Sequence, residues 1–295
     1  MNIVSLLPSA TEIVHALGRG DDLAGVTFEC DFPLDARADA EIVVGGLDTS
    51  DMDPLEIDLL VRARIAAGEQ LYELDVERLR RIEPDTILTQ DLCRVCALPA
   101  GHVDDALAMI GCHANVITLD PKTLDEVLTT ILTIGEATGA NEAATSLVAG
   151  LRGRLRAVRA AVTDAPRQRV FVLEWSDPPF VAGHWIPDLV EAAGGQPVLC
   201  EPGTRSHPTD WPTITAARPD VVVVAPCGFD TIGAAQQAGD VLHRLPPASA
   251  VWAVDANSYF VRPGPRLVDG VEVLAGILHP DRWPAPPTKQ ATRIR

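Results

Sequence analysis

A proline-free stretch at residues 123–163 most constrains the fold of this chain. Its apolar residues recur at the spacing of an α-helix, at Leu124, Val127, Leu128, Ile131 and Leu132 and again at Leu147, Val148, Leu151, Leu155 and Val158. On both sides, short β-rich runs alternate with helical ones, a pattern typical of parallel sheets covered by helices. The sequence therefore predicts an α/β protein with two parallel-sheet α/β lobes, joined by a long linker helix, and a ligand cleft between them.

The chain of 295 residues has room for two domains with separate cores. We predict an N-terminal α/β lobe over residues 1–121, a helical linker region over 122–166, a C-terminal α/β lobe over 167–283 and a frayed tail over 284–295. Gly139 divides the linker region into two helices, because glycine favours helix ends. We expect the first helix, residues 124–138, to be the crossover and the second to pack on the C-terminal lobe.

Apolar runs bounded by turn residues predict the strands of both lobes. In the first lobe they cover residues 3–7, 23–28, 86–89 and 115–119; in the second they cover residues 169–174, 220–225 and 250–254. Residues 34–54 are expected to be irregular, with a turn at Gly45 and Gly46. Because ligands of open parallel sheets bind beyond the carboxyl ends of the strands, the site is sought there.

The segments just past these strand ends are rich in aromatic and polar side chains. The candidate ligand-binding residues found there are Ser9, Phe32, Gln90, Asp91, Trp175, Phe180, Tyr259 and Phe260. Aromatic rings give rigid contact area at low entropy cost, which suits a large, flat, partly apolar ligand. In the alternative interpretation, the rings merely close the core of each lobe.

Four cysteines also follow strand ends, namely Cys30, Cys93, Cys96 and Cys227. Cys93 and Cys96 have the C-x-x-C spacing that lets two thiolates bind one metal ion, and Cys30 or Cys227 would add a third ligand. The same spacing also occurs in redox dithiols. Metal ligands, redox dithiol and unligated thiols therefore remain three open interpretations.

Charge and hydropathy exclude several classes of partner. Residues 1–121 carry 8 Lys and Arg against 23 Asp and Glu, and such an acidic lobe repels the phosphates of nucleic acid. No apolar stretch reaches the roughly 18 residues of a membrane span.

The first residues lack the basic segment and apolar core of a signal peptide, so we expect a cytoplasmic protein. The sequence also lacks G-x-S-x-G, P-loop and dinucleotide-binding motifs, which favours a protein that is not an enzyme.

Short motifs in a fixed order run over nearly the whole chain. They are SLLPSATE at residues 5–12, DFP at 31–33, IEPD at 82–85, PPFVAG at 178–183, AGG at 193–195, RPD at 218–220 and YFVRPGPR at 259–266. By these motifs the chain resembles the helical-backbone (class III) periplasmic binding proteins, which serve importers of vitamin B12, ferric siderophores and heme. The segments ECD at 29–31, CRVC at 93–96 and PCGFD at 226–230 are similar to a cytosolic subgroup of cobalamin-binding proteins.

The resemblance implies a non-enzymatic protein that binds cobalamin, another corrinoid or a related metal chelate. It implies a small-molecule ligand and, as partner, an ABC transporter or a corrinoid-handling protein. Phe32, Phe180 and Tyr259 match ring positions of the family's pocket, and Arg262 or Arg266 would meet acidic or phosphate groups of the ligand. The alternative function is a cysteine-ligated metal-binding or redox protein with its site in the interlobe cleft. An enzyme acting on a corrinoid is a third hypothesis.

Overall fold

The computed structural model describes residues 1–47, 49, 52–90, 103, 107 and 113–295. The chain divides into two compact units. The N-terminal unit consists of Met1–Pro121 and Leu128–Ala149, and the C-terminal unit consists of Lys122–Val127 and Gly150–Arg295. Each unit contains its own β-sheet and its own buried apolar core.

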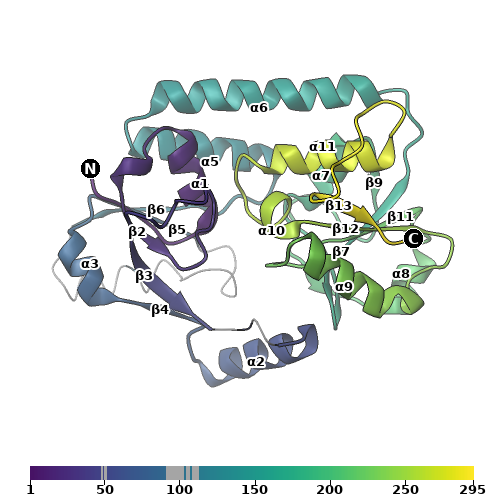
Figure 1. The fold of residues 1–295 in the computed structure, drawn as a ribbon, viewed down its shortest axis with the longest axis horizontal. Coiled ribbons are helices and arrows are strands. Elements are labelled where there is room, and N and C mark those ends of the chain that lie inside the picture. The colour runs from purple at the N-terminus through teal and green to yellow at the C-terminus, as the bar shows by residue number, and fades with distance from the viewer. Residues whose placement is uncertain (48, 50–51, 91–102, 104–106, 108–112) are drawn as a thin grey trace. The chain divides into compact units, whose positions relative to one another are not determined.

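The N-terminal unit contains a six-stranded sheet in the order β4-β3-β2-β1-β5-β6 (Figure 1). Its strands are β1 (Ile3–Ser5), β2 (Leu23–Thr27), β3 (Glu41–Gly46), β4 (Tyr72–Leu74), β5 (Thr86–Thr89) and β6 (Asn115–Thr118). Neighbouring strands are parallel except at the edge, where β4 runs antiparallel to β3. The carboxyl ends of β2, β1 and β5 therefore lie side by side at one edge of this sheet.

The helical elements that the structure describes between these strands are α1 (Pro8–Ala16), the 3₁₀ turn η1 (Gly20–Asp22), α2 (Pro54–Ala67) and α3 (Val76–Ile82). Local capping signals set the bounds of α2. The Asp53 carboxylate accepts the Glu56 N–H (2.8 Å) while the Glu56 carboxylate accepts the Asp53 N–H (3.0 Å), a capping box that begins α2. Gly68 ends α2 at φ 72°, a left-handed conformation that costs glycine little.

Two consecutive helices follow, α5 (Leu124–Ala137) and α6 (Asn141–Val162). Gly139, with φ 68°, separates them, which confirms the predicted break. Residues 124–127 of α5 belong to the C-terminal unit, whereas residues 141–149 of α6 belong to the N-terminal unit. The expectation that the whole second helix packs on the C-terminal lobe is therefore wrong for its first part.

The C-terminal unit contains a seven-stranded sheet in the order β10-β8-β7-β11-β12-β13, with β9 also paired to β7. The strands are β7 (Arg169–Ser176), β8 (Pro179–Val181), β9 (Gln196–Pro197), β10 (His207–Pro208), β11 (Val221–Val224), β12 (Ala250–Val254) and β13 (Ala291–Arg293). The centre, β7-β11-β12, is parallel, and most of its residues are apolar and buried. A strand buried on both faces reads as a continuous apolar run, and VVVV of β11 is such a run.

Helices cover both faces of the C-terminal sheet. They are α7 (Ile186–Ala192), α8 (Trp211–Ala216), α9 (Thr231–Val241), η2 (Leu242–Arg244), α10 (Ala256–Tyr259) and α11 (Leu267–Leu278). Figure 1 shows α7 and α11 on one face and α8 and α9 on the other. On the second face, Phe171 and Val222 of the sheet share a buried cluster with Ile214 of α8 and Ala238 of α9. This packing fixes the carboxyl ends of β7, β11 and β12.

The predicted α/β fold class is confirmed, and two further details of the prediction are wrong. Residues 34–54 are not wholly irregular, because β3 pairs with both β2 and β4. Residues 284–295 are not a frayed tail, because β13 pairs antiparallel with β12 and the Arg295 guanidinium donates to the carbonyl of Pro246 (2.6 Å). The ligand cleft between the lobes stays a prediction. Within the described part of the chain, no helix is both long enough and apolar enough to cross a bilayer.

Candidate functional site

The carboxyl edge of β7, β11 and β12 carries a tilted pair of aromatic rings. Trp175 lies near the end of β7, and Phe229 lies in the loop at 226–230 that follows β11. Their ring centroids are 6.0 Å apart with an interplanar angle of 57°, within the range of favourable aromatic pairs. Both side chains are half-buried. The Trp175 indole N–H donates to the Asp177 carbonyl (3.1 Å), so its polar atom is satisfied.

Backbone hydrogen bonds hold the loop at 226–230 against both flanking strands. The Cys227 N–H donates to the Glu174 carbonyl in β7 (3.2 Å). The Asn257 N–H, just past β12, donates to the Phe229 carbonyl (3.1 Å). The Asp230 carboxylate then accepts from the N–H groups of residues 232 and 233 (3.0 and 2.9 Å) and begins α9. The position of Phe229 is therefore set by three neighbouring elements.

A hydrogen-bonded polar cluster of Glu174, Ser206 and Gly183 adjoins this edge. The Ser206 hydroxyl donates to the Glu174 carboxylate (2.6 Å) and accepts the Gly183 N–H (3.1 Å). Glu174 is half-buried, so the Ser206 hydroxyl compensates part of the cost of removing its charge from water. The carboxylate places hydrogen-bond acceptors at the edge that carries the aromatic rings.

The other predicted residues of the C-terminal unit differ in exposure. Phe180 is half-buried and pairs across the β7–β8 hairpin with Trp175. Tyr259 is also half-buried, with the Arg266 guanidinium carbon 5.9 Å from its ring centroid, a cation–π distance. Phe260 has no exposed surface and Arg262 has 9%. Because the Phe260 side chain has no exposed surface, its predicted contact with a ligand has no support in this structure and stays a prediction.

The carboxyl edge of the N-terminal sheet carries the remaining predicted residues. Ser9 and Gln90 are buried, with 3% and 6% of their surface exposed, whereas Phe32 is 42% exposed. Among the predicted ligand-binding residues of this edge that the structure describes, Phe32 thus has the most exposed side chain. Asp91 lies outside the described residues.

The predicted cysteine metal set has no support in the structure. Cys30 is 1% exposed, and its Sγ lies 3.0 Å from Thr11 Oγ1, which donates in turn to the Ser5 hydroxyl (2.8 Å). Cys227 is exposed, and Cys93 and Cys96 lie outside the described residues. Among the residues that the structure describes, no group of three or more His, Cys, Asp or Glu side chains is placed to hold a metal ion.

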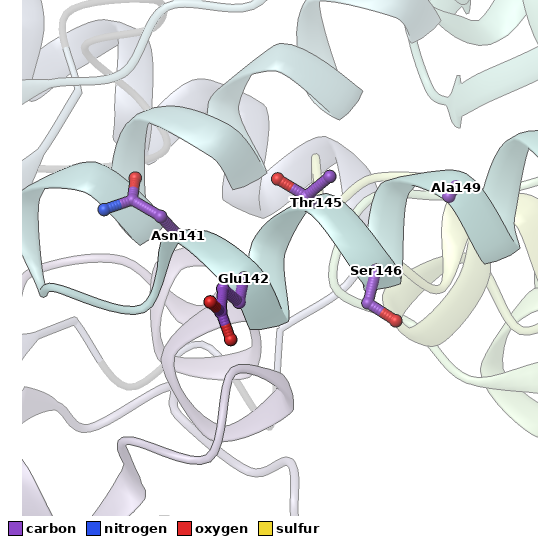
Figure 2. Close-up of a pocket in the computed structure, with 5 residues that line it drawn as sticks. All are labelled: Asn141, Glu142, Thr145, Ser146 and Ala149. Atoms are coloured by element: carbon purple, nitrogen blue, oxygen red, sulfur yellow. The ribbon is translucent and has the colours of Figure 1, made fainter.

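A further pocket lies on α6 and contains none of the predicted site residues. Figure 2 shows the five residues that line it, Asn141, Glu142, Thr145, Ser146 and Ala149. All five belong to one helix. Ligand sites of proteins are concave and apolar, with polar groups that converge from several elements. The α6 pocket lacks such convergence, so the carboxyl edge of the C-terminal sheet remains the better candidate.

The chain belongs to the periplasmic binding protein family, because residues 3–260 match the model of that family. This confirms the resemblance inferred from the motifs. Members of the family bind solutes, so this chain is a solute-binding protein.

Individual relatives cover most of the chain at low identity. An uncharacterized ABC transporter substrate-binding lipoprotein of Bacillus subtilis is 25% identical over 290 residues, which are 95% of this chain and 81% of the relative. A cobalamin-binding protein of Halobacterium salinarum is 26% identical over 287 residues, 94% of this chain and 69% of the relative.

Solved structures share the fold. The periplasmic vitamin B12-binding protein of Vibrio cholerae has a TM-score of 0.67 at 22% identity, covering 94% of this chain and 96% of its own. A periplasmic heme-binding protein of Pseudomonas aeruginosa has a TM-score of 0.73 at 20% identity, covering 99% and 97%. At these identities the likeness establishes the fold, and the choice of ligand must come from the site.

The candidate ligand-binding residues predicted from the sequence do not include Phe229, whereas Cys227 of the same loop is a candidate metal ligand. The available signal was position, because Phe229 follows the carboxyl end of a buried parallel strand as Trp175 does.

Proposed function

We propose that this chain is a non-enzymatic binding protein for cobalamin, another corrinoid or a related metal chelate. The observation that carries the proposal is the group of half-buried rings at the carboxyl edge of the C-terminal sheet, formed by Trp175, Phe180, Phe229 and Tyr259. Four rings on one sheet edge exceed what closing a core requires, and they suit a large ligand with a flat apolar face. The Halobacterium cobalamin-binding protein and the Vibrio vitamin B12-binding protein add support for a corrinoid.

Polar groups beside the rings fit the periphery of such a ligand. Corrinoids carry amide side chains, whose N–H groups need acceptors, and Glu174 with Ser206 presents acceptors at this edge. Corrinoids with a nucleotide arm also carry a phosphate, and the Arg266 guanidinium beside Tyr259 supplies a cation for it. Heme carries carboxylates that the same cation would bind, so heme is the comparison ligand.

We propose that an ABC transporter or a corrinoid-handling protein receives the ligand. The family of the chain supports a transporter as the recipient, and so does the Bacillus relative, an ABC transporter substrate-binding lipoprotein. The cytoplasmic location expected from the sequence stays a prediction. The Bacillus relative is a lipoprotein, and the Vibrio and Pseudomonas proteins are periplasmic.

Titration with cyanocobalamin tests the proposal. We expect saturable heat in calorimetry and a shift of the corrin absorption bands, with a dissociation constant at or below the micromolar range. Hemin is titrated in parallel, and mass spectrometry of the released ligand tests for chemical change. Absence of binding to either ligand at micromolar concentration would contradict the proposed function, and a modified ligand would contradict its non-enzymatic part.

A further inference from the structure

We propose that Phe229 and Trp175 form one preformed aromatic platform that contacts the flat face of the bound macrocycle, and that Gly233 is the residue that positions it. This inference rests on the proposed function and deepens it, because it names a binding residue, a positioning residue and a preferred ligand shape. It concerns the C-terminal unit by itself.

The Trp175 and Phe229 rings form a tilted pair. The centroids of the two rings lie 6.0 Å apart, and the ring planes are inclined by 57°. Both residues are half-buried, so each keeps some exposed surface. A conjugated macrocycle can lie along such a pair, whereas a globular hexadentate iron chelate would touch it over a small area. The platform therefore favours corrins and porphyrins over siderophore-type chelates.

Backbone hydrogen bonds fix the position of Phe229. The hydrogen bonds from Cys227 N–H to the Glu174 carbonyl and from Asn257 N–H to the Phe229 carbonyl attach the loop to β7 and to the residues after β12. A ring that is already held in its binding position loses little conformational entropy when a ligand arrives. The platform is thus built in advance of binding.

The Phe229 ring closely approaches α9 at Gly233. A Cβ atom placed on Gly233 would lie 2.7 Å from Phe229 Cδ1 and 3.3 Å from Phe229 Cβ. The first distance is too short for two carbon atoms, so the ring packs where only a glycine leaves room. Alanine at position 233 would push the Phe229 ring away from its place beside Trp175.

The same helix supplies a matched control. Gly239 also lies in α9, and a Cβ placed there has no neighbouring heavy atom within 4 Å. Glycine-to-alanine changes at both positions alter helix propensity in the same direction. A difference between the two variants therefore reports the contact with Phe229 and not the stability of the helix.

The test compares the wild-type protein with Phe229→Ala, Phe229→Tyr, Gly233→Ala and Gly239→Ala. Each is titrated with cyanocobalamin, hemin and ferrioxamine B by calorimetry, and the tryptophan bands of the near-ultraviolet circular dichroism spectrum monitor the ring pair. We expect Phe229→Ala to weaken binding of the preferred macrocycle about tenfold, which is about 1.4 kcal/mol at 25 °C. Phe229→Tyr should retain binding, because it keeps the ring. Gly233→Ala should weaken binding and change the tryptophan bands, and Gly239→Ala should do neither.

The outcomes separate this inference from the proposed function. If the wild-type protein binds a macrocycle and both Phe229→Ala and Gly233→Ala bind it equally well, the platform is refuted while the proposed function stands. Tighter binding of ferrioxamine B than of either macrocycle also refutes the platform. A wild-type protein that binds neither macrocycle overturns the proposed function and the platform together. If Phe229→Ala does not fold, the Gly233→Ala and Gly239→Ala pair decides.

Discussion

Arg154 connects two helices of the C-terminal unit, and its removal should destabilise that unit measurably. Its guanidinium on α6 donates twice to Glu272 on α11 (2.9 and 2.6 Å) and once to Asp269. Charge-assisted hydrogen bonds contribute about 1.5–3 kcal/mol when shielded from water, and exposed ion pairs contribute about 0–1. The Arg154, Asp269 and Glu272 side chains keep 39%, 31% and 28% exposure, which is intermediate. We expect Arg154→Ala to lower the free energy of unfolding by about 2 kcal/mol.

Urea denaturation at 25 °C, followed by circular dichroism, measures this change, and the chain offers a control two residues earlier. Arg152 pairs with Asp125 (2.9 Å), but these side chains are 47% and 79% exposed. Water screens such a pair, so Arg152→Ala should cost about 0.5 kcal/mol or less. Both changes remove the same side chain from the same helix. A loss for Arg154→Ala no larger than that for Arg152→Ala would refute the assignment of the Arg154 cluster as a stabilising link.

Three further predictions concern half-buried groups. Asp188 accepts the Leu124 N–H (2.8 Å) at the start of α5, so Asp188→Ala should lower Tm while Asp188→Asn, which keeps an acceptor, should not. Burial lowers the pKa of His184 below its ordinary 6.5, so the unfolded chain binds that proton first. Stability should therefore fall as pH drops through 6.5, and less so in His184→Asn. Burial raises the pKa of Cys200 to about 12, so iodoacetamide at pH 8 should label exposed Cys227 and spare Cys200 in peptide mass spectra.

Each of these predictions has a result that contradicts it. Equal Tm values for Asp188→Ala and Asp188→Asn would show that the acceptor to α5 has no effect on stability. An identical pH profile in His184→Asn would assign the acid sensitivity to other groups. Equal labelling of Cys200 and Cys227 would mean that the Cys200 site opens to solvent on the timescale of the reaction.

The elements predicted best are those whose bounds are encoded locally. The bounds of α2 and α3 follow from such local signals, because Asp53 caps one N-terminus, Asp75 caps the other, and Gly68 ends α2. β12 is likewise found at its predicted residues, since its apolar run ends at Asp255, which caps the next helix. Caps and turns act over a few residues, so a single sequence contains all the information that they need.

The elements missed are those that depend on distant partners. β3 contains Gly45 and Gly46, which favour a turn when considered alone, yet the strand forms between β2 and β4. β13 comes after a proline-rich segment, and it forms because the edge of β12 offers free hydrogen-bonding groups about forty residues earlier in the chain. Pairing partners so far away leave no local pattern to detect.

Strand-end position predicted which segments reach the carboxyl edge, but it did not predict which way each side chain points. Tyr259 and Phe260 are neighbours at the end of α10, and one is half-buried while the other has no exposed surface. Consecutive side chains diverge in direction, so a contiguous aromatic pair seldom serves one ligand face. In this pair the Phe260 carbonyl accepts the Trp185 indole N–H (2.7 Å), which ties Phe260 to the core.

Phe229 shows why a binding residue can depend on a residue that touches no ligand. Gly233 and Gly239 each weaken α9 by about 1 kcal/mol relative to alanine, and sequence alone assigns both the same cost. The structure distinguishes them, because a side chain at 233 would displace Phe229 whereas one at 239 would meet open space. A helix that keeps a glycine next to a ring at a strand-end loop gives up stability for the position of that ring.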